Sequence, residues 1–252
     1  MKRLVCLPVC AALVMSLVLL AAGPASAQET RDKQIERVQG AADVLNEIMA
    51  APDRGIPEEI IGSAKCVAVV PSLLKGGFVF GAARGKGVAS CRTANGWSAP
   101  AFFTVTGGSF GFQIGGQAVD LVMLVMNDTG MQSLLSSKFK LGADASVAAG
   151  PVGRHAEGAT DLVMRAQVLT YSRARGVFAG ITLNGAVVKQ GRDDTFAFYG
   201  RMIPHRTILT GGVPAPQDSK PYLDTLARYS PVQPQPAHAS ATQVPTAGGG
   251  NR

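Results

Sequence analysis

The feature that most constrains the fold is a series of short, β-prone apolar segments that glycines separate. Their centre is the stretch from Cys91 to Asn127, which holds the only tryptophan, Trp97. Segments of this length with turn residues between them are typical of an antiparallel sandwich or barrel. The segments are Cys66–Pro71, Phe78–Ala82, Val88–Arg92, Ala101–Thr106, Phe110–Ile114 and Val119–Met126.

Two Asn-Gly dipeptides, Asn95-Gly96 and Asn184-Gly185, predict tight turns. Asn and Gly tolerate the positive φ angles that a type I′ turn requires, so each dipeptide is expected to close a hairpin. The strands they are expected to join are Val88–Arg92 with Trp97–Thr104, and Val177–Leu183 with Ala186–Lys189.

Helical patterns precede the strands and interrupt them once. Apolar residues recur every three to four positions in Arg31–Ala50, which predicts an amphipathic helix. Pro57 suits the first turn of a second short helix, and Asp128–Ser136 predicts a third that Asn127 or Asp128 caps. The sequence therefore predicts an α+β protein, predominantly antiparallel β and sandwich or barrel-like, with N-terminal helices lying on the sheet.

The two ends of the chain differ from its centre. Lys2-Arg3 precede an apolar run that ends in Ala25-Ser26-Ala27, the layout of a secretory signal cut after Ala27. An uncleaved membrane anchor is the alternative. We therefore expect a secreted or periplasmic protein with a signal at 1–27. A domain is expected at 28–203, with helices within 31–64 and a β-rich core at 65–200. Residues 204–252 are rich in Pro, Gly and Ala and are expected to form a largely disordered tail, with at most a short helix at Tyr222–Arg228.

Positive charge is concentrated in the β-rich part. Residues 65–206 hold fifteen basic and seven acidic side chains, whereas residues 28–64 hold four basic and eight acidic ones. A cationic surface favours anionic partners such as phospholipid headgroups, lipopolysaccharide or nucleic acid, although it also serves solubility. Aromatic residues make up only 6% of the chain, mostly Phe in apolar runs, so a base-stacking platform for nucleic acid is not expected.

Cysteine and histidine usage points to a disulfide and away from metal. Only Cys66 and Cys91 remain after signal cleavage, and an even pair in an oxidising compartment suggests a disulfide between adjacent strands. Two separate buried thiols are the alternative. The three histidines, His155, His205 and His238, have unrelated spacings, so neither a metal site nor another cofactor is expected.

Catalytic motifs are weak. Gly107-Gly108-Ser109-Phe110-Gly111 matches the nucleophile elbow G-x-S-x-G, with Asp144 and His155 following in triad order. An elbow needs a helix after the serine, and here a strand is expected, so a serine hydrolase is a remote alternative. Gly85-Lys86-Gly87 lacks the spacing and the Ser or Thr of a phosphate loop. No catalytic residue is assigned.

Basic clusters are the better candidate site. Arg84 and Lys86 are expected in one turn and Arg173 and Arg175 in another, where they would grip phosphate groups at about 1 kcal/mol per residue near an anionic membrane. Three further cations are expected to join them if the turns converge: Lys75, Arg92 and Arg154. Lys189 and Arg192 are chosen as control cations outside this site.

Eight sequence blocks stand in unbroken order over about Ala41 to Gly200. They are Ile56–Ser72, Lys75–Gly81, Gly85–Arg92, Gly96–Phe103, Gly111–Val122, Ala149–Arg154, Tyr171–Gly185 and Phe198–Gly200. Together they resemble the SYLF lipid-binding domain family, which includes the yeast actin-regulator domain that binds the Las protein. The resemblance implies a non-enzymatic module that binds acidic phospholipids through a basic surface and an amphipathic N-terminal helix. In a secreted protein, phosphatidylglycerol, cardiolipin or lipopolysaccharide are the expected ligands, at the membrane surface.

Two classes of function follow from the sequence. The first is binding of anionic lipid at a membrane surface by the basic residues. The second is a structural or adhesive envelope protein whose proline-rich tail makes protein contacts. Salt-sensitive binding to anionic vesicles separates them.

Overall fold

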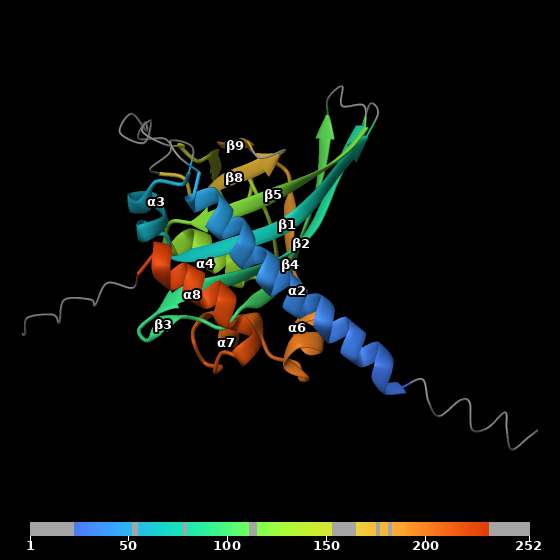
Figure 1. Ribbon diagram of the computed structural model, residues 1–252. Helices are drawn as coiled ribbons and strands as arrows, with labels where there is room; N and C mark the ends of the chain where they lie inside the picture. Colours follow the sequence, from blue (N-terminus) through green and yellow to red (C-terminus); the bar gives the residue numbers. More distant parts are fainter. Residues whose placement is uncertain are drawn as a thin grey trace, which may run out of the picture.

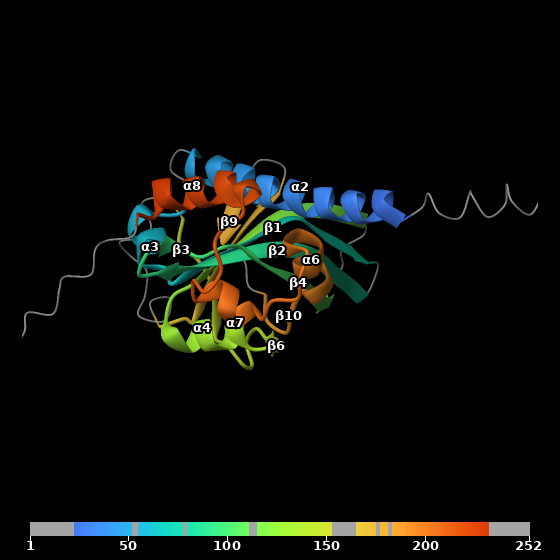
Figure 2. The ribbon, with the colours of Figure 1, turned by 90° about the horizontal axis from the view of Figure 1, so that it is seen from below.

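A single curled sheet with helices on both of its faces forms the body of the protein (Figures 1 and 2). The computed structural model describes residues 23–51, 55–77, 80–110, 115–152, 165–174, 177–180 and 183–231. Within them the sheet has ten strands and curls strongly, like half a barrel. The α+β class and the predominantly antiparallel sheet are therefore confirmed.

The strand order is β6-β10-β4-β2-β1-β5-β8-β7, with β3 paired to β2 and β9 to β8. The pairs are antiparallel except β7 with β8, which is parallel. The strands are β1 (Cys66–Gly77), β2 (Phe80–Thr93), β3 (Gly96–Trp97), β4 (Ala101–Phe110), β5 (Gly115–Val125), β6 (Lys138–Lys140), β7 (Val147–Ala149), β8 (Val168–Ala174), β9 (Val177–Gly180) and β10 (Val187–Gln190).

Helices cover the sheet in two layers. α2 and α8 lie side by side across one face, and α4 and α7 lie against the other (Figure 2). We call these the α2 face and the α4 face. The helical segments are α2 (Gly23–Met49), α3 (Glu58–Ser63), α4 (Asp128–Leu135), α6 (Arg192–Tyr199), α7 (His205–Leu209), the 3₁₀ turn η2 (Gln217–Ser219) and α8 (Lys220–Tyr229).

Alternation along the strands produces a separate apolar core on each face. In β1, Val67 and Val69 point to the α2 face, while Ala68 and Val70 point to the α4 face. All four are buried. Since burying a valine or leucine side chain contributes about 1.5–3 kcal/mol, a strand that is apolar on both sides must be covered on both sides.

α2 confirms the predicted amphipathic stripe. Val38, Ala42, Leu45 and Ile48 are buried on the α2 face, and Ile35 packs against them. The helix begins earlier than expected, at Gly23, and so includes the predicted cleavage point. Cleavage stays a prediction, because residues 1–22 lie outside the described residues. No helix in the described part of the chain is long and apolar enough to cross a membrane.

One of the two predicted hairpins is confirmed and the other is wrong. β2 and β3 pair Thr93 with Gly96 across the first turn. At the second site Asn184-Gly185 does form a turn, with Gly185 at a φ of 85°. Its flanking strands, however, pair elsewhere: β9 with β8, and β10 with β4 and β6. The dipeptide specified the local turn, whereas burial of Val188 in the core of the α4 face specified the strand partner.

The folded part also extends beyond the limit expected near 203. The disordered tail was expected to begin at residue 204, but α7, η2 and α8 follow, with Ile208, Tyr222 and Leu226 fully buried. Tyr222 donates a hydrogen bond from its hydroxyl to the carbonyl of Val67, at 2.9 Å. The high proline content of this segment led to the wrong expectation, because its apolar residues are buried by tertiary contacts. Tyr222 and Leu226 are buried in the core of the α2 face, and Ile208 is buried in the core of the α4 face. Residues 232–252 lie outside the described residues.

The predicted disulfide is present. Cys66 on β1 is directly opposite Cys91 on β2, and their sulfur atoms are bonded. Directly opposed residues on antiparallel strands have the close Cβ atoms that a disulfide needs. Both residues are fully buried, so the bond links the two central strands from within the core of the α4 face.

Candidate functional site

Four neighbouring strands present polar side chains on the α2 face, beyond the area that the helix α2 covers. Register aligns these side chains in rows across the sheet. In one row Lys138 is opposite Lys189, Lys189 is opposite Thr104, and Thr104 is opposite Lys86. In the next row Thr106 is opposite Arg84. Opposite residues on antiparallel strands have Cβ atoms about 5 Å apart, so the rows bring these cations together.

The Gly85-Lys86-Gly87 segment lies within β2, not in the turn that the sequence predicted. A Cβ atom on Gly85 would lie 2.5 Å from Cγ1 of Val70, and one on Gly87 would lie 2.3 Å from the carbonyl oxygen of Val69. The α4 face is therefore too crowded for any side chain at these two positions. Lys86 alternates with the glycines and points to the α2 face, as Arg84 does.

A groove of about 860 Å³ runs over these rows, and we call it the cationic groove. Its five basic side chains are all exposed, and four of them, those other than Lys86, have no carboxylate partner among the described residues. They come from β2, β6, β10 and the first turn of α6. The residues are Arg84, Lys86, Lys138, Lys189 and Arg192, accompanied by Thr104, Thr106, Asp193 and Asp194.

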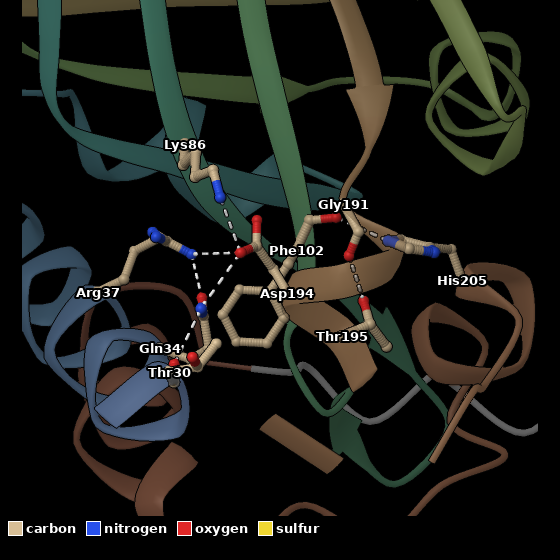
Figure 3. A network of polar contacts seen from close by, with 9 residues as sticks. All are labelled: Thr30, Gln34, Arg37, Lys86, Phe102, Gly191, Asp194, Thr195 and His205. Atoms are coloured by element: carbon tan, nitrogen blue, oxygen red, sulfur yellow. Dashed lines mark hydrogen bonds and ion pairs between the residues drawn. The ribbon is translucent and has the colours of Figure 1, made fainter. Parts of the chain in front are cut away.

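Asp194 connects the groove to α2 (Figure 3). Its carboxylate is almost fully buried and accepts hydrogen bonds from Lys86 Nζ at 2.9 Å and from Gln34 Nε2 at 3.2 Å. The guanidinium of Arg37 lies 3.7 Å away. Burial lowers the pKa of Arg37, and the nearby Asp194 opposes that shift. One carboxylate thus balances two cations, one from α2 and one from the groove.

The start of α6 is fixed against β4, which sets the position of Asp194 (Figure 3). The carbonyl of Phe102 accepts hydrogen bonds from the backbone N–H of Gly191 at 2.8 Å and from Nε2 of His205 at 2.6 Å. The hydroxyl of Thr195 donates to the carbonyl of Gly191 at 2.9 Å. Burial lowers the pKa of His205 and so favours the neutral imidazole, whose Nε2–H can donate to this carbonyl.

Comparison with known proteins assigns the family. Residues 106–229 match the family model Ysc84, described as a Las17-binding protein actin regulator. SH3 domain-containing YSC84-like protein 1 is 34% identical over 75% of this chain in Rattus norvegicus and 33% identical over 75% in Homo sapiens. LAS seventeen-binding protein 3 of Saccharomyces cerevisiae is 33% identical over 73% of the chain.

The chain contains a Ysc84 (SYLF) domain. It spans 58% of the rat relative and 39% of the yeast relative, so those proteins extend well beyond the shared region. The resemblance that the sequence motifs indicated is thereby confirmed.

Within this SYLF domain the seven cations expected from the sequence do not form one site. Arg84 and Lys86 lie together in the cationic groove. Lys75 lies near the end of β1 and does not line the groove, and partial burial lowers its pKa. Arg154 and Arg175 fall outside the described residues.

Arg92 ties parts of the SYLF domain together. Its guanidinium donates to the carbonyls of Ala64 at 2.8 Å and Gly62 at 2.7 Å, and to the hydroxyl of Ser230. It also stacks over the ring of Trp97, 4.9 Å from the centroid. These contacts join the end of α3 to the end of α8, so Arg92 has a structural role in the described fold.

Arg173 is paired with acidic residues. It contacts the carboxylates of Asp120, at 2.6 Å, and Glu47 of α2. Two carboxylates around one guanidinium leave no net positive charge at this point. Arg173 therefore joins β8, β5 and α2, on a part of the sheet that does not line the cationic groove.

The groove includes cations that sequence reasoning missed. Lys189 and Arg192, chosen as controls outside the site, line the same groove as Arg84 and Lys86, and Lys138 joins them from β6. Their proximity follows from the pairing of β10 with β4, which the wrongly predicted second hairpin concealed. A local signal for α6 did exist, since Asp193 and Asp194 occupy its first turn and Gly200 ends it at a φ of 70°.

The hydrolase alternative gains no support from the described geometry. Ser109 lies within β4, paired with Gly81, and the next described element is the strand β5. A nucleophile elbow needs a helix at that place. Asp144 accepts a hydrogen bond from the backbone of Lys140, and His155 lies outside the described residues. In the described part of the chain no three His, Cys, Asp or Glu side chains form a group suited to a metal ion.

Proposed function

We propose that the SYLF domain binds the headgroups of anionic lipids at a membrane surface, without catalysis, through its cationic groove. One observation carries the proposal: five basic side chains from four elements converge on one face of the sheet, and four of them lack a carboxylate partner among the described residues. Uncompensated charge of this kind attracts phosphate groups, at about 1 kcal/mol per basic residue near an anionic membrane.

An exposed leucine beside the groove supports a membrane as the partner. A bulge in β1 after Val70 shifts its register, so Leu73 is buried while Leu74 is 63% exposed. Leu74 is directly opposite Arg84 and shares its face. An apolar side chain flanked by cations suits the boundary between headgroups and acyl chains.

The compartment is part of the proposal. The predicted signal would deliver the protein to the periplasm or the exterior, where phosphatidylglycerol, cardiolipin and lipopolysaccharide supply anionic headgroups. The buried Cys66–Cys91 disulfide agrees with an oxidising compartment. The names of the relatives mention neither a secretory signal nor a lipid ligand.

Vesicle co-sedimentation tests the proposal. The chain from Gln28 onward should sediment with vesicles of phosphatidylcholine and phosphatidylglycerol, less so as salt rises, and not with phosphatidylcholine alone. Arg84→Gln combined with Lys189→Gln should weaken binding about thirtyfold, because two groove cations are lost. Lys33→Gln with Lys220→Gln removes the same charge from exposed i,i+4 ion pairs elsewhere and should have little effect.

Equal losses in the two double variants would mean that net charge, and not the groove, attracts the membrane. Absence of binding to anionic vesicles at low salt would exclude lipid. Binding of an acidic protein partner by the same groove would then be the favoured function, because one yeast relative is named for binding LAS seventeen and the matched family model is described as Las17-binding.

A further inference from the structure

Four of the five cations of the groove fall into two groups with a threonine strand between them, and the fifth, Arg192, lies at the start of α6. Arg84 and Lys86 form the β2 pair, and Lys138 and Lys189 form the β6–β10 pair. β4 lies between the groups and contributes Thr104 and Thr106. The floor of the groove is thus basic at both sides and hydroxylated in the middle.

Register sets the distance between the two groups. Thr104 is opposite Lys86 on one side and opposite Lys189 on the other. Two strand spacings therefore separate the β2 backbone from the β10 backbone, roughly 10 Å, and β6 lies one spacing further. A phosphate group spans far less than this distance.

Lys86 is held on its own side of the groove. Its Nζ lies 2.9 Å from the buried carboxylate of Asp194, which also faces Arg37. A single phosphate above Thr104 would have to draw Lys86 away from Asp194 to reach Lys189 at the same time. The arrangement favours one anionic group at each side over one shared group in the centre.

Charge leads to the same conclusion. The groove is lined by five basic and two acidic side chains, which leaves a net charge of +3. One phosphodiester carries a single negative charge and would leave most of this uncompensated. A ligand with two phosphate groups matches the groove more closely.

We infer that the cationic groove recognises a headgroup with two phosphate groups joined by a hydroxyl-bearing linker. The β2 pair takes one phosphate, the β6–β10 pair takes the other, and the hydroxyls of Thr104 and Thr106 bond to the linker. This inference rests on the proposed binding of anionic lipid and names the kind of headgroup.

The test compares two phosphate arrangements at equal surface charge. Vesicles of phosphatidylcholine are prepared with diphosphatidylglycerol or with phosphatidylglycerol, at the same total phosphate charge and the same salt. Diphosphatidylglycerol has two phosphates joined by a glycerol that keeps one hydroxyl. We expect about tenfold tighter binding to it, because the β6–β10 pair engages the second phosphate.

Variants show whether the groove produces this preference. Lys138→Gln with Lys189→Gln should abolish the tenfold preference and leave residual binding to both kinds of vesicle through the β2 pair. The matched control, Lys33→Gln with Lys220→Gln, should keep the preference. Since Lys138 and Lys189 are exposed, thermal unfolding of the variant should match that of the parent protein.

Failures of the two proposals are distinguishable. Equal binding to both vesicle types overturns the two-phosphate inference and leaves the lipid proposal standing. Binding to neither vesicle type at low salt, together with no binding of a soluble bisphosphate, overturns both. A soluble arm separates the sources of phosphate: a sugar bisphosphate should displace the protein from vesicles at lower concentration than the corresponding monophosphate. If calorimetry shows binding of the soluble bisphosphate and the protein sediments with neither vesicle type, a lipid is not the source of the two phosphate groups.

Discussion

At the scale of single residues, Asp194 contacts one cation of the groove and one cation of α2. It is the buried carboxylate that holds Lys86 of the groove and faces Arg37 of α2. A carboxylate in this position stabilises two nearby cations, and under the proposed function it would compete with a lipid phosphate for Lys86. Stability and binding are therefore expected to respond to its removal in opposite directions.

Asp194→Asn should lower the free energy of unfolding by about 2 kcal/mol, because Arg37 loses its buried counter-charge. It should also tighten binding to phosphatidylglycerol vesicles about fivefold, since Lys86 becomes available. Urea unfolding and co-sedimentation measure the two effects. Asp193→Asn is the matched control, because it changes the charge equally at an exposed position in the same turn. If both variants tighten binding equally and neither loses stability, Asp194 has no special role.

At the scale of elements, His205 links α7 to β4 through the carbonyl of Phe102. Burial holds the pKa of this imidazole below its ordinary value. The unfolded chain, with a histidine pKa of about 6.5, binds a proton there at a pH where the folded protein does not. The contribution of His205 to the free energy of unfolding therefore has its full value above about pH 6.5 and decreases as the pH falls below that value.

Replacing His205 with Gln keeps a side-chain donor and removes the titration. The free energy of unfolding of the parent should fall more steeply than that of His205→Gln between about pH 6.5 and pH 5. Urea denaturation at a series of pH values measures both slopes, and any uniform offset between the proteins is disregarded. Parallel curves would show that His205 does not titrate differently in the folded and unfolded states.

The elements differ in how far the sequence could predict them. α2, α3 and α4 follow from periodicity and caps that lie within a few residues, as when Asn127 accepts a hydrogen bond from the N–H of Gly130. The burial of α8 depends on contacts with α2 and β1, which lie far away in the sequence and which no local pattern predicts. The i,i+4 spacing of Tyr222 and Leu226 did indicate one apolar stripe. Strand partners were the hardest to predict, because β10 could be placed only by its long-range burial beside β4.

The same limit applied to the candidate site. The sequence identified Arg84 and Lys86, and it could not show that they share a face with Lys138 and Lys189, which lie far along the chain. Nor could it show that Arg92 and Arg173 are committed to structural contacts. A count of basic residues predicts the sign of a partner's charge. The register of the strands determines which of these residues lie close enough together to contact the same partner.

At the scale of the whole molecule, the disulfide and the cationic groove occupy different parts of the same strand. β2 carries Cys91 near one end, disulfide-bonded within the core, and Lys86 five positions earlier in the groove. Five strand residues span roughly 17 Å. The disulfide therefore stabilises the central strands without contacting the groove, and it can be removed to separate stability from binding.

The double variant Cys66→Ala, Cys91→Ala should lower the free energy of unfolding by about 3 kcal/mol, the loop-closure contribution expected for a crosslink across 25 positions. Its binding to anionic vesicles should match that of the parent under conditions where both are folded, because the register of β2 with β4 depends on buried neighbours such as Val88 and Phe102. Urea titrations with and without reductant provide the control: reductant should destabilise the parent to the level of the variant and leave the variant unchanged. Loss of vesicle binding in the folded variant would show that the disulfide sets the geometry of the cationic groove at a distance, and the independence of these two parts of β2 would then be wrong.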